Sequence, residues 1–162
     1  MLNGKKMSEL AFLKLDQVDL NAMLEILNKE STRAHLIEHK VFDLNDVKQW
    51  VLGKLEVDAM AGCRVRAVEL DGVLAGWCGI QEEKGEFEMA IVIDDSHWGI
   101  GKRIFNEMML WAVEMEHKTV VIHLLKTRRK YKFLEKVANR VSDSTLMGAL
   151  FTSYELDVSR WK

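Results

Sequence analysis

The chain has 162 residues, of which 48% are hydrophobic and 30% are charged, and its formal net charge is −2 at pH 7. This length and composition predict one soluble domain over residues 1–162, with a sizeable core. No apolar run approaches the roughly 20 residues of a membrane-spanning helix. The lysine-containing start has no apolar segment behind it that would make a signal peptide. We therefore expect a cytoplasmic protein that does not bind membranes or polyanions in bulk.

Cysteine usage argues against a disulfide framework and against a metal site. Cys63 and Cys78 are the two cysteines, and they fall in segments that are predicted to be separate strands. Two distant thiols of this kind are usually small buried hydrophobic residues. The sequence therefore predicts no metal ligands.

The N-terminal third is predicted to form a strand and two helices. The strand covers residues 10–15, and Asp16 is expected to cap a helix that ends before the polar stretch 31–40, a loop or short broken helix. A second helix begins at Asp43 or Asn45. The apolar positions at helical spacing are Leu20, Met23, Leu24 and Leu27 in the first helix, and Val47, Trp50, Val51 and Leu55 in the second.

Three strands joined by tight turns are predicted next, over residues 64–70, 73–81 and 86–93. Asp71-Gly72 suits a type I′ hairpin turn between the first two strands, and Lys84-Gly85 supplies the second turn. Apolar residues alternate with other residues along the third strand, as in a half-buried strand.

The second half is predicted to contain a helix, a strand, a helix and a last strand. A glycine-bearing turn precedes a helix that runs to Met115 and carries one apolar stripe. A buried strand over 119–125, a helix over 128–139 and a strand over 152–158 follow. The stripe consists of Ile104, Met108, Trp111 and Met115, and Tyr131, Leu134 and Ala138 align on the later helix.

The glycine-bearing turn, Ser96-His-Trp-Gly-Ile-Gly101, connects a strand end to a helix N-terminus. The N–H groups of a first helical turn have no intrahelical partner and carry the positive end of the helix dipole, so such a turn can bind a phosphate. Gly99 and Gly101 leave room for a ligand to approach the backbone, and Lys102 adds a cation. An ordinary strand-to-helix turn would use two glycines equally well.

In its context this turn resembles the acetyl-CoA-binding motif of the GNAT superfamily of N-acetyltransferases. That motif is a strand, then Gln/Arg-x-x-Gly-x-Gly/Ala, then a long helix. Both glycines match, whereas Ser96 replaces the Gln or Arg and offers a hydroxyl. The predicted order of elements is also similar to the GNAT fold over nearly the whole chain. The resemblance implies an α/β (α+β) single-domain fold with a mixed, mostly antiparallel central sheet flanked by helices.

The resemblance also implies that acetyl-CoA is the co-substrate and lies in a V-shaped opening between the fourth and fifth strands. Its pyrophosphate would bind the N–H groups of the turn, and its pantetheine arm would bond the backbone of the fourth strand. Thr127 stands where the family has an asparagine. The residues implied to bind acetyl-CoA are Ile91, Val92, Ile93, Ser96, His97, Trp98, Gly99, Ile100, Gly101, Lys102 and Thr127.

Acetyl transfer to an amine needs a base that removes a proton from the ammonium group and an acid that protonates the departing thiolate. Glutamate on the fourth strand is used as base in some family members, so Glu86 and Glu88 are the candidate bases, with a preference for Glu88. The alternative is that both are solvated carboxylates on the outer face of a half-buried strand.

The family's acid is a tyrosine on the helix after the fifth strand, in a segment that ends Phe/Tyr-Tyr-Glu-Lys. Aligning this ending with residues 133–136 places Leu134 at the tyrosine position. Tyr131, one turn earlier, is the candidate acid, although it also fits an interfacial tyrosine with its hydroxyl in solvent, and solvent itself can protonate a thiolate. His123 fits a hydrogen-bonded core residue better than a catalyst, and His97 fits a turn residue.

The sequence thus predicts an N-acetyltransferase that moves the acetyl group of acetyl-CoA directly to a primary amine. One alternative is a degenerate member that binds acyl-CoA or a partner without turnover, because Ser96, Thr127 and Leu134 depart from the family pattern. Another is a toxin-like enzyme that acetylates aminoacyl-tRNA through the basic segment 126–140. That segment also fits a solvated helix face that meets the 3′-phosphate of the co-substrate. Family members often dimerise, so a homodimer is a further expectation.

Overall fold

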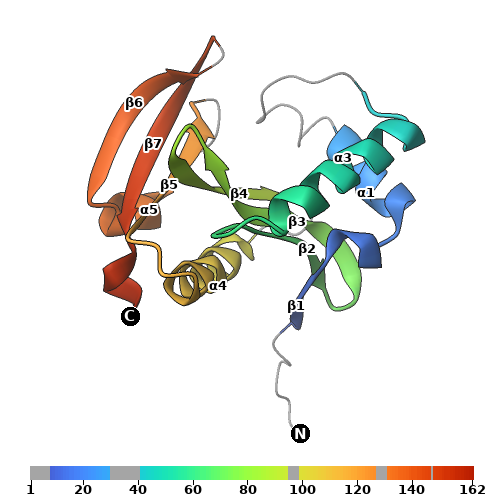
Figure 1. Ribbon diagram of the computed structural model, residues 1–162, viewed down its shortest axis with the longest axis horizontal. Helices are drawn as coiled ribbons and strands as arrows, with labels where there is room; N and C mark the ends of the chain where they lie inside the picture. Colours follow the sequence, from blue (N-terminus) through green and yellow to red (C-terminus); the bar gives the residue numbers. More distant parts are fainter. Residues whose placement is uncertain (1–7, 30–40, 95–98, 127–130, 147) are drawn as a thin grey trace, which may run out of the picture.

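The computed structural model describes residues 8–29, 41–94, 99–126, 131–146 and 148–162. Within these ranges one mixed sheet has the strand order β1-β2-β3-β4-β5-β7-β6 (Figure 1). All neighbouring strands are antiparallel except β4 and β5, which are parallel. The strands are β1 (Leu10–Leu13), β2 (Arg64–Leu70), β3 (Val73–Glu83), β4 (Glu86–Ile93), β5 (Thr119–Leu125), β6 (Arg140–Leu146) and β7 (Ala149–Asp157).

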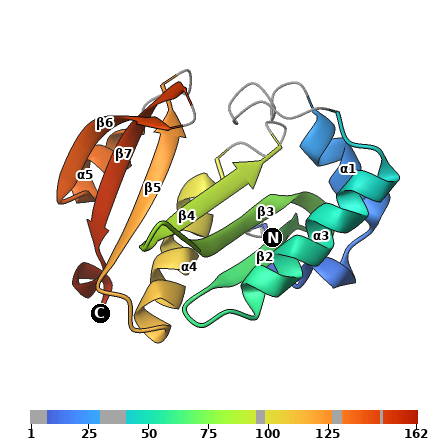
Figure 2. The same ribbon diagram turned by 45° about the horizontal axis from the view of Figure 1, so that its top comes forward.

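The helices cover the two faces of this sheet. They are α1 (Leu20–Asn28), α3 (Leu44–Asp58), α4 (Gly101–Glu114) and α5 (Lys132–Val137). Figure 2 shows α1 and α3 on one side of β2, β3 and β4, with α4 on the other side. The predicted fold class, a mixed and mostly antiparallel sheet flanked by helices, is confirmed. In the described ranges the structure contains no helix long and apolar enough to cross a membrane.

A separate apolar core lies on each face of the sheet, because side chains alternate between the faces along every strand. On the face of α4, Met89 of β4 packs with Ile104 and Met108. On the face of α3, Val92 of β4 packs with Val47. All are fully or nearly fully buried. Burial of each such side chain stabilises the fold by about 1.5–3 kcal/mol relative to exposure.

The start of each N-terminal helix is fixed by an aspartate cap. Asp43 caps α3, its Oδ1 accepting from Asp46 N at 2.8 Å, which confirms one of the two predicted starts. The predicted cap Asp16 is wrong, because it lies inside a short 3₁₀ turn, and Asp19 caps α1 instead. The Asp19 carboxylate reaches the N–H of Asn21 at 2.9 Å and so satisfies a donor that the helix leaves free.

Both predicted hairpin turns are present. Asp71 and Gly72 have φ angles of 52° and 81°, and Lys84 and Gly85 have 51° and 82°. Two successive residues with positive φ are the signature of a type I′ turn, and its twist matches that of the flanking strands. The turns therefore place β2, β3 and β4 side by side, in the predicted order.

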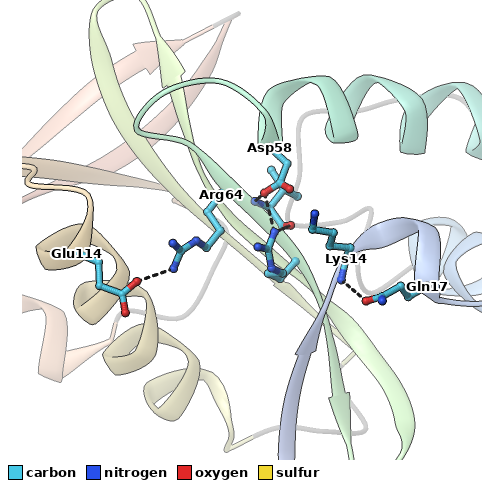
Figure 3. A network of polar contacts seen from close by, with 7 residues as sticks. Lys14, Gln17, Asp58, Arg64 and Glu114 are labelled. Atoms are coloured by element: carbon cyan, nitrogen blue, oxygen red, sulfur yellow. Dashed lines mark hydrogen bonds and ion pairs between the residues drawn. The ribbon is translucent and has the colours of Figure 1, made fainter.

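Polar contacts join helices on both faces of the sheet to β2 (Figure 3). Asp58, the last residue of α3, accepts hydrogen bonds from Val65 N at 2.8 Å and from Arg66 Nη1 at 2.6 Å. Arg64 instead reaches α4, where its Nη1 donates to Glu114 Oε2 at 2.9 Å. The ends of α3 and α4 are therefore tied to the same strand.

The prediction for the last part of the chain is wrong in two respects. In place of the expected helix over 128–139, the described residues form only the short α5, and Ala138 already has an extended backbone. A strand that was not predicted, β6, then pairs with β7, which begins at Ala149 rather than at residue 152. Gly148, with φ of 79°, lies in the turn between them. The sheet accordingly has one strand more than the sequence predicted.

Candidate active site

The sheet opens between β4 and β5. The two strands pair at a single position, Glu88 with Val121, whereas β3 pairs with β4 all the way to Ile93. Figure 2 shows β4 and β5 diverging toward their carboxyl ends. Beyond Glu88, the edge of β4 that faces β5 has no strand partner among the described residues, so its backbone N–H and C=O groups are available to a ligand. Ile91, Val92 and Ile93, predicted to bond the pantetheine arm, lie on this part of β4.

The glycine-bearing turn follows the end of β4 and leads into α4. A Cβ built on Gly99, where φ is 101°, would meet no atom within 4 Å, and one on Gly101 would meet only Ile93 Cδ1 at 3.9 Å. The N-cap residue of α4 is Ile100, and no side-chain cap bond to the first turn of the helix is present among the described residues. The described part of the turn therefore combines uncapped helix N–H groups with open space, as phosphate binding requires.

The remaining predicted binding residues contribute unequally. The Ile100 side chain is buried in the core and leaves only its backbone for a ligand, whereas the Lys102 side chain is exposed at the start of α4. Ser96, His97, Trp98 and Thr127 lie outside the described residues.

The two candidate bases differ in environment. Glu88 is half-buried on β4, on the face opposite the buried Met89, while the Glu86 side chain is 59% exposed. Burial raises the pKa of the Glu88 carboxyl, nearby His123 opposes the rise, and Glu83 adds to it. A carboxylate with a raised pKa accepts a proton more readily near neutral pH, so Glu88 is better suited than an ordinary surface glutamate to act as a base.

A lysine from α3 completes the surroundings of Glu88. Lys54 Nζ donates to Gln81 Oε1 at 2.6 Å and lies 4.7 Å from the centroid of the Trp77 ring. Burial lowers the pKa of Lys54, while the charge of Glu88 acts against that shift. Gln81 and Glu88 are register partners on β3 and β4, which places all these polar groups on the α3 face of the sheet.

His123 on β5 belongs to the same group. Its Nδ1 is 2.6 Å from Ser153 Oγ of β7, and its Nε2 is 4.0 Å from Glu86 Oε1. Ser153 Oγ is in turn 2.8 Å from Ser144 Oγ of β6. From the sequence alone, His123 fits a hydrogen-bonded core residue. Side chains alternate between the two faces along β5, and this alternation could have placed His123. Ile122 and Leu124 are buried on the α4 face, so His123 lies on the other face, with the carboxylates of β4.

The residues considered for the acid lie elsewhere. Leu134, which the alignment placed at the family's tyrosine position, is 2% exposed in the core on the α4 face, so this position does not face the opening. Tyr131 immediately precedes α5 and packs against the same core, with its ring centroid 6.0 Å from that of Phe133. Glu88 and His123 lie on the opposite face of the sheet.

The segment 126–140 is only partly described. Lys126 pairs with Asp143 of β6, with Nζ 2.8 Å from Oδ2, while Lys132 and Lys136 are exposed. At the end of β4, Lys29 Nζ lies 2.6 Å from the Oδ1 of Asp94, whose residue is 8% exposed, and so joins the end of α1 to this strand.

Other features of the described chain do not compete with this site. A hollow lined by residues including Glu116, His117 and Lys118 lies at the amino end of β5, the end farthest from the glycine turn. Among the described residues no three His, Cys, Asp or Glu side chains are grouped so as to hold a metal ion. Cys63 and Cys78 are buried free thiols, as predicted.

Comparison with solved structures confirms the predicted GNAT fold. A GNAT-family acetyltransferase from Bacillus anthracis has a TM-score of 0.74 at 15% identity, covering 94% of this chain and 98% of the other. Spermidine N-acetyltransferase from Vibrio cholerae, in complex with CoA and spermine, has a TM-score of 0.71 at 15% identity, with 95% and 97% covered. A putative acetyltransferase from Salmonella typhimurium with acetyl-CoA has a TM-score of 0.66 at 15% identity, with 94% and 95% covered. No protein-family model and no curated protein sequence matches the chain. The fold is therefore that of the GNAT N-acetyltransferases.

Proposed function

We propose that the chain is an acetyl-CoA-dependent N-acetyltransferase that acts on a primary amine by direct transfer. The observation that carries this proposal is the divergence of β4 and β5 beyond Glu88, next to the N-terminus of α4. This helix begins at Gly101, two residues after Gly99, and its N-cap residue makes no side-chain cap bond. Structures of the same fold that hold CoA or acetyl-CoA support the choice of co-substrate.

In this proposal the backbone of Gly101 and the first turn of α4 bind the pyrophosphate. The pantetheine arm bonds the edge of β4 from Ile91 to Ile93, which has no partner among the described strands. Glu88 takes a proton from the acceptor ammonium, because its raised pKa favours proton uptake. Glu86 is the second candidate base, and its greater exposure makes it the weaker one. Tyr131 stays a candidate acid predicted from the sequence.

Two measurements on the purified chain test the proposal: thermal unfolding with acetyl-CoA, and thiol release from acetyl-CoA across a panel of primary amines. The panel includes spermidine, phosphinothricin and a peptide with a free α-amino group, acceptors suggested by the names of structural neighbours. We expect a higher melting temperature and amine-dependent thiol release. Stabilisation without thiol release would favour the binding module instead, and no stabilisation would contradict the proposal.

A further inference from the structure

A row of polar side chains crosses the α3 face of the sheet where the described helices do not cover it. It starts at Glu86 on β4, continues through His123 on β5 and Ser153 on β7, and ends at Ser144 on the edge strand β6. The successive contacts are 4.0 Å from Glu86 Oε1 to His123 Nε2, 2.6 Å from His123 Nδ1 to Ser153 Oγ, and 2.8 Å between the two serine Oγ atoms. The imidazole is thus held on one side and faces the carboxylates of β4 on the other.

The position of His123 relative to the opening gives this row a chemical role. Glu88 and Val121 form the single pair between β4 and β5, and His123 lies two residues beyond Val121 on the same face. The imidazole therefore projects at the point where the two strands separate, beside both candidate bases. It is 13% exposed, so it is shielded but still reachable.

We propose that His123 is a catalytic residue of the acetyl transfer, its Nε2 taking a proton from the attacking nitrogen and giving it to the departing sulfur. This inference rests on the proposed function. His123 takes the role of the acid, which the buried Leu134 cannot fill, since a histidine near neutral pH serves as both acid and base.

The hydroxyls of Ser153 and Ser144 are compatible with the tautomer that this role requires. When Nδ1–H donates to Ser153 Oγ and Ser153 donates to Ser144 Oγ, the lone pair of Nε2 faces β4. Each serine hydroxyl can donate one hydrogen bond and accept others, so both contacts permit this direction of donation. Ser153 is thereby a positioning residue, which acts through His123.

The proton balance closes with these groups. The acceptor enters as an ammonium, and Glu88 takes its first proton, which later leaves to solvent. The neutral nitrogen attacks the thioester carbonyl carbon, the N–C bond forms, the C–S bond breaks, and the electron pair stays on sulfur. The second proton of the nitrogen passes to Nε2 of His123 and from there to sulfur, giving an amide and a free thiol.

Several charged groups lie around the imidazole and contribute to the pH dependence of turnover. Glu86 and Glu88 face it from β4, and Glu83 and Lys54 act on Glu88 from β3 and α3. On β7, Glu155 lies two residues from Ser153 on the same face and accepts from Asn139 Nδ2 at 3.1 Å. The pH profile of turnover therefore reports this whole group.

The experiment compares His123→Gln, His123→Gly and Ser153→Ala with His117→Gln as the matched control. His117 packs on Phe87, with ring centroids 4.1 Å apart, and its Nε2 is 2.8 Å from Gly62 O, so it lies away from the row. We expect His123→Gln to lower kcat about 100-fold or more, with the KM for acetyl-CoA nearly unchanged. Added imidazole should restore part of the turnover of His123→Gly, and Ser153→Ala should displace the pH profile.

A second measurement needs no acceptor. The ¹⁵N signals of the His123 ring, assigned by their loss in His123→Gln, should shift when CoA is added, while those of His117 should stay in place. A kcat for His123→Gln within threefold of wild type, or unchanged His123 ring signals in the CoA complex, would overturn the inference and leave the proposed function standing. A wild-type chain that acetyl-CoA does not stabilise overturns both.

Discussion

Gly101 is the position where a side chain should separate co-substrate binding from folding. It is the first residue of α4, and an added Cβ would meet only Ile93 Cδ1 at 3.9 Å, an ordinary van der Waals contact. Gly101→Ala at such a compatible site should raise the free energy of unfolding by about 0.4–1 kcal/mol, because the unfolded chain loses freedom. Gly99 is less suitable, since φ of 101° strains any other residue.

Gly101→Val should weaken acetyl-CoA binding strongly, because its methyl groups occupy the space where the pyrophosphate reaches the helix N–H groups. A hydrogen bond to a charged group contributes about 1.5–3 kcal/mol. At about 1.4 kcal/mol per tenfold change in Kd, the loss of one such bond weakens binding roughly 10- to 150-fold. Gly101→Ala should show a smaller loss in the same direction.

The assay is calorimetric titration of folded variants with acetyl-CoA and with S-acetyl pantetheine, which lacks the pyrophosphate. Gly53→Val is the matched control, because Gly53 is exposed in α3 and an added Cβ there meets no atom within 4 Å. We expect Gly101→Val to lose acetyl-CoA affinity and to keep its affinity for S-acetyl pantetheine. An unchanged Kd for acetyl-CoA in folded Gly101→Val would refute the placement of the phosphates.

Glu88→Gln should lower kcat about 100-fold and Glu86→Gln less, with little change in acetyl-CoA affinity; equal activity of both variants and wild type would mean that neither carboxylate is the base. Burial raises the Glu88 pKa, and the base works in its ionised form. As the pH is lowered, wild-type turnover should therefore begin to fall at a higher pH than it would for a glutamate with an ordinary pKa. Glu88→Gln should lack this acidic limb in a pH-rate profile. Leu134→Tyr should lower the free energy of unfolding by about 1–3 kcal/mol without raising turnover, since the side chain lies in the core; a gain in thiol release would contradict the buried position. Lys29→Met should cost about 1–3 kcal/mol in denaturant unfolding, because it removes the ammonium beside the Asp94 carboxylate, and Lys29→Met with Asp94→Asn should cost less than the sum of the single changes.

Local chemistry predicted the parts of the fold that neighbouring residues determine. Asp71-Gly72 and Lys84-Gly85 adopt the positive φ angles of type I′ turns, and Asp43 caps α3 as expected. These features depend on a few adjacent residues, so one sequence is enough to predict them. Asp16 failed as a cap because Asp19, three residues later, offers the same chemistry closer to the apolar stripe of α1.

The edge strand β6 could not be predicted in the same way. Its sequence is Arg-Val-Ser-Asp-Ser-Thr-Leu, and among the described strands it pairs only with β7. The residues from Val141 to Thr145 are exposed or half-buried. Without a buried face the strand lacks the alternation that identifies a half-buried strand. Its pairing comes from the Gly148 turn and from β7.

The polar group around Glu88 and His123 was predicted only in part, for a topological reason. Glu86 and Glu88 were named because they lie on the strand before the glycine turn. His123 and Ser153 meet them only because β7 inserts between β5 and β6 and β5 runs parallel to β4, an arrangement that depends on contacts distant in sequence. The placement of Leu134 failed because a four-residue ending is too short to fix the rotation of a helix.

A crystal structure of the chain with acetyl-CoA is the decisive test of where the co-substrate binds. We predict electron density for the pyrophosphate at the N–H groups of the first turn of α4, for the pantetheine arm along β4 beyond Glu88, and for the acetyl group beside Glu88 and His123. Density for acetyl-CoA elsewhere, such as the hollow beside Glu116 and Lys118, would contradict a co-substrate site between β4 and β5. So would the absence of bound acetyl-CoA at saturating concentration.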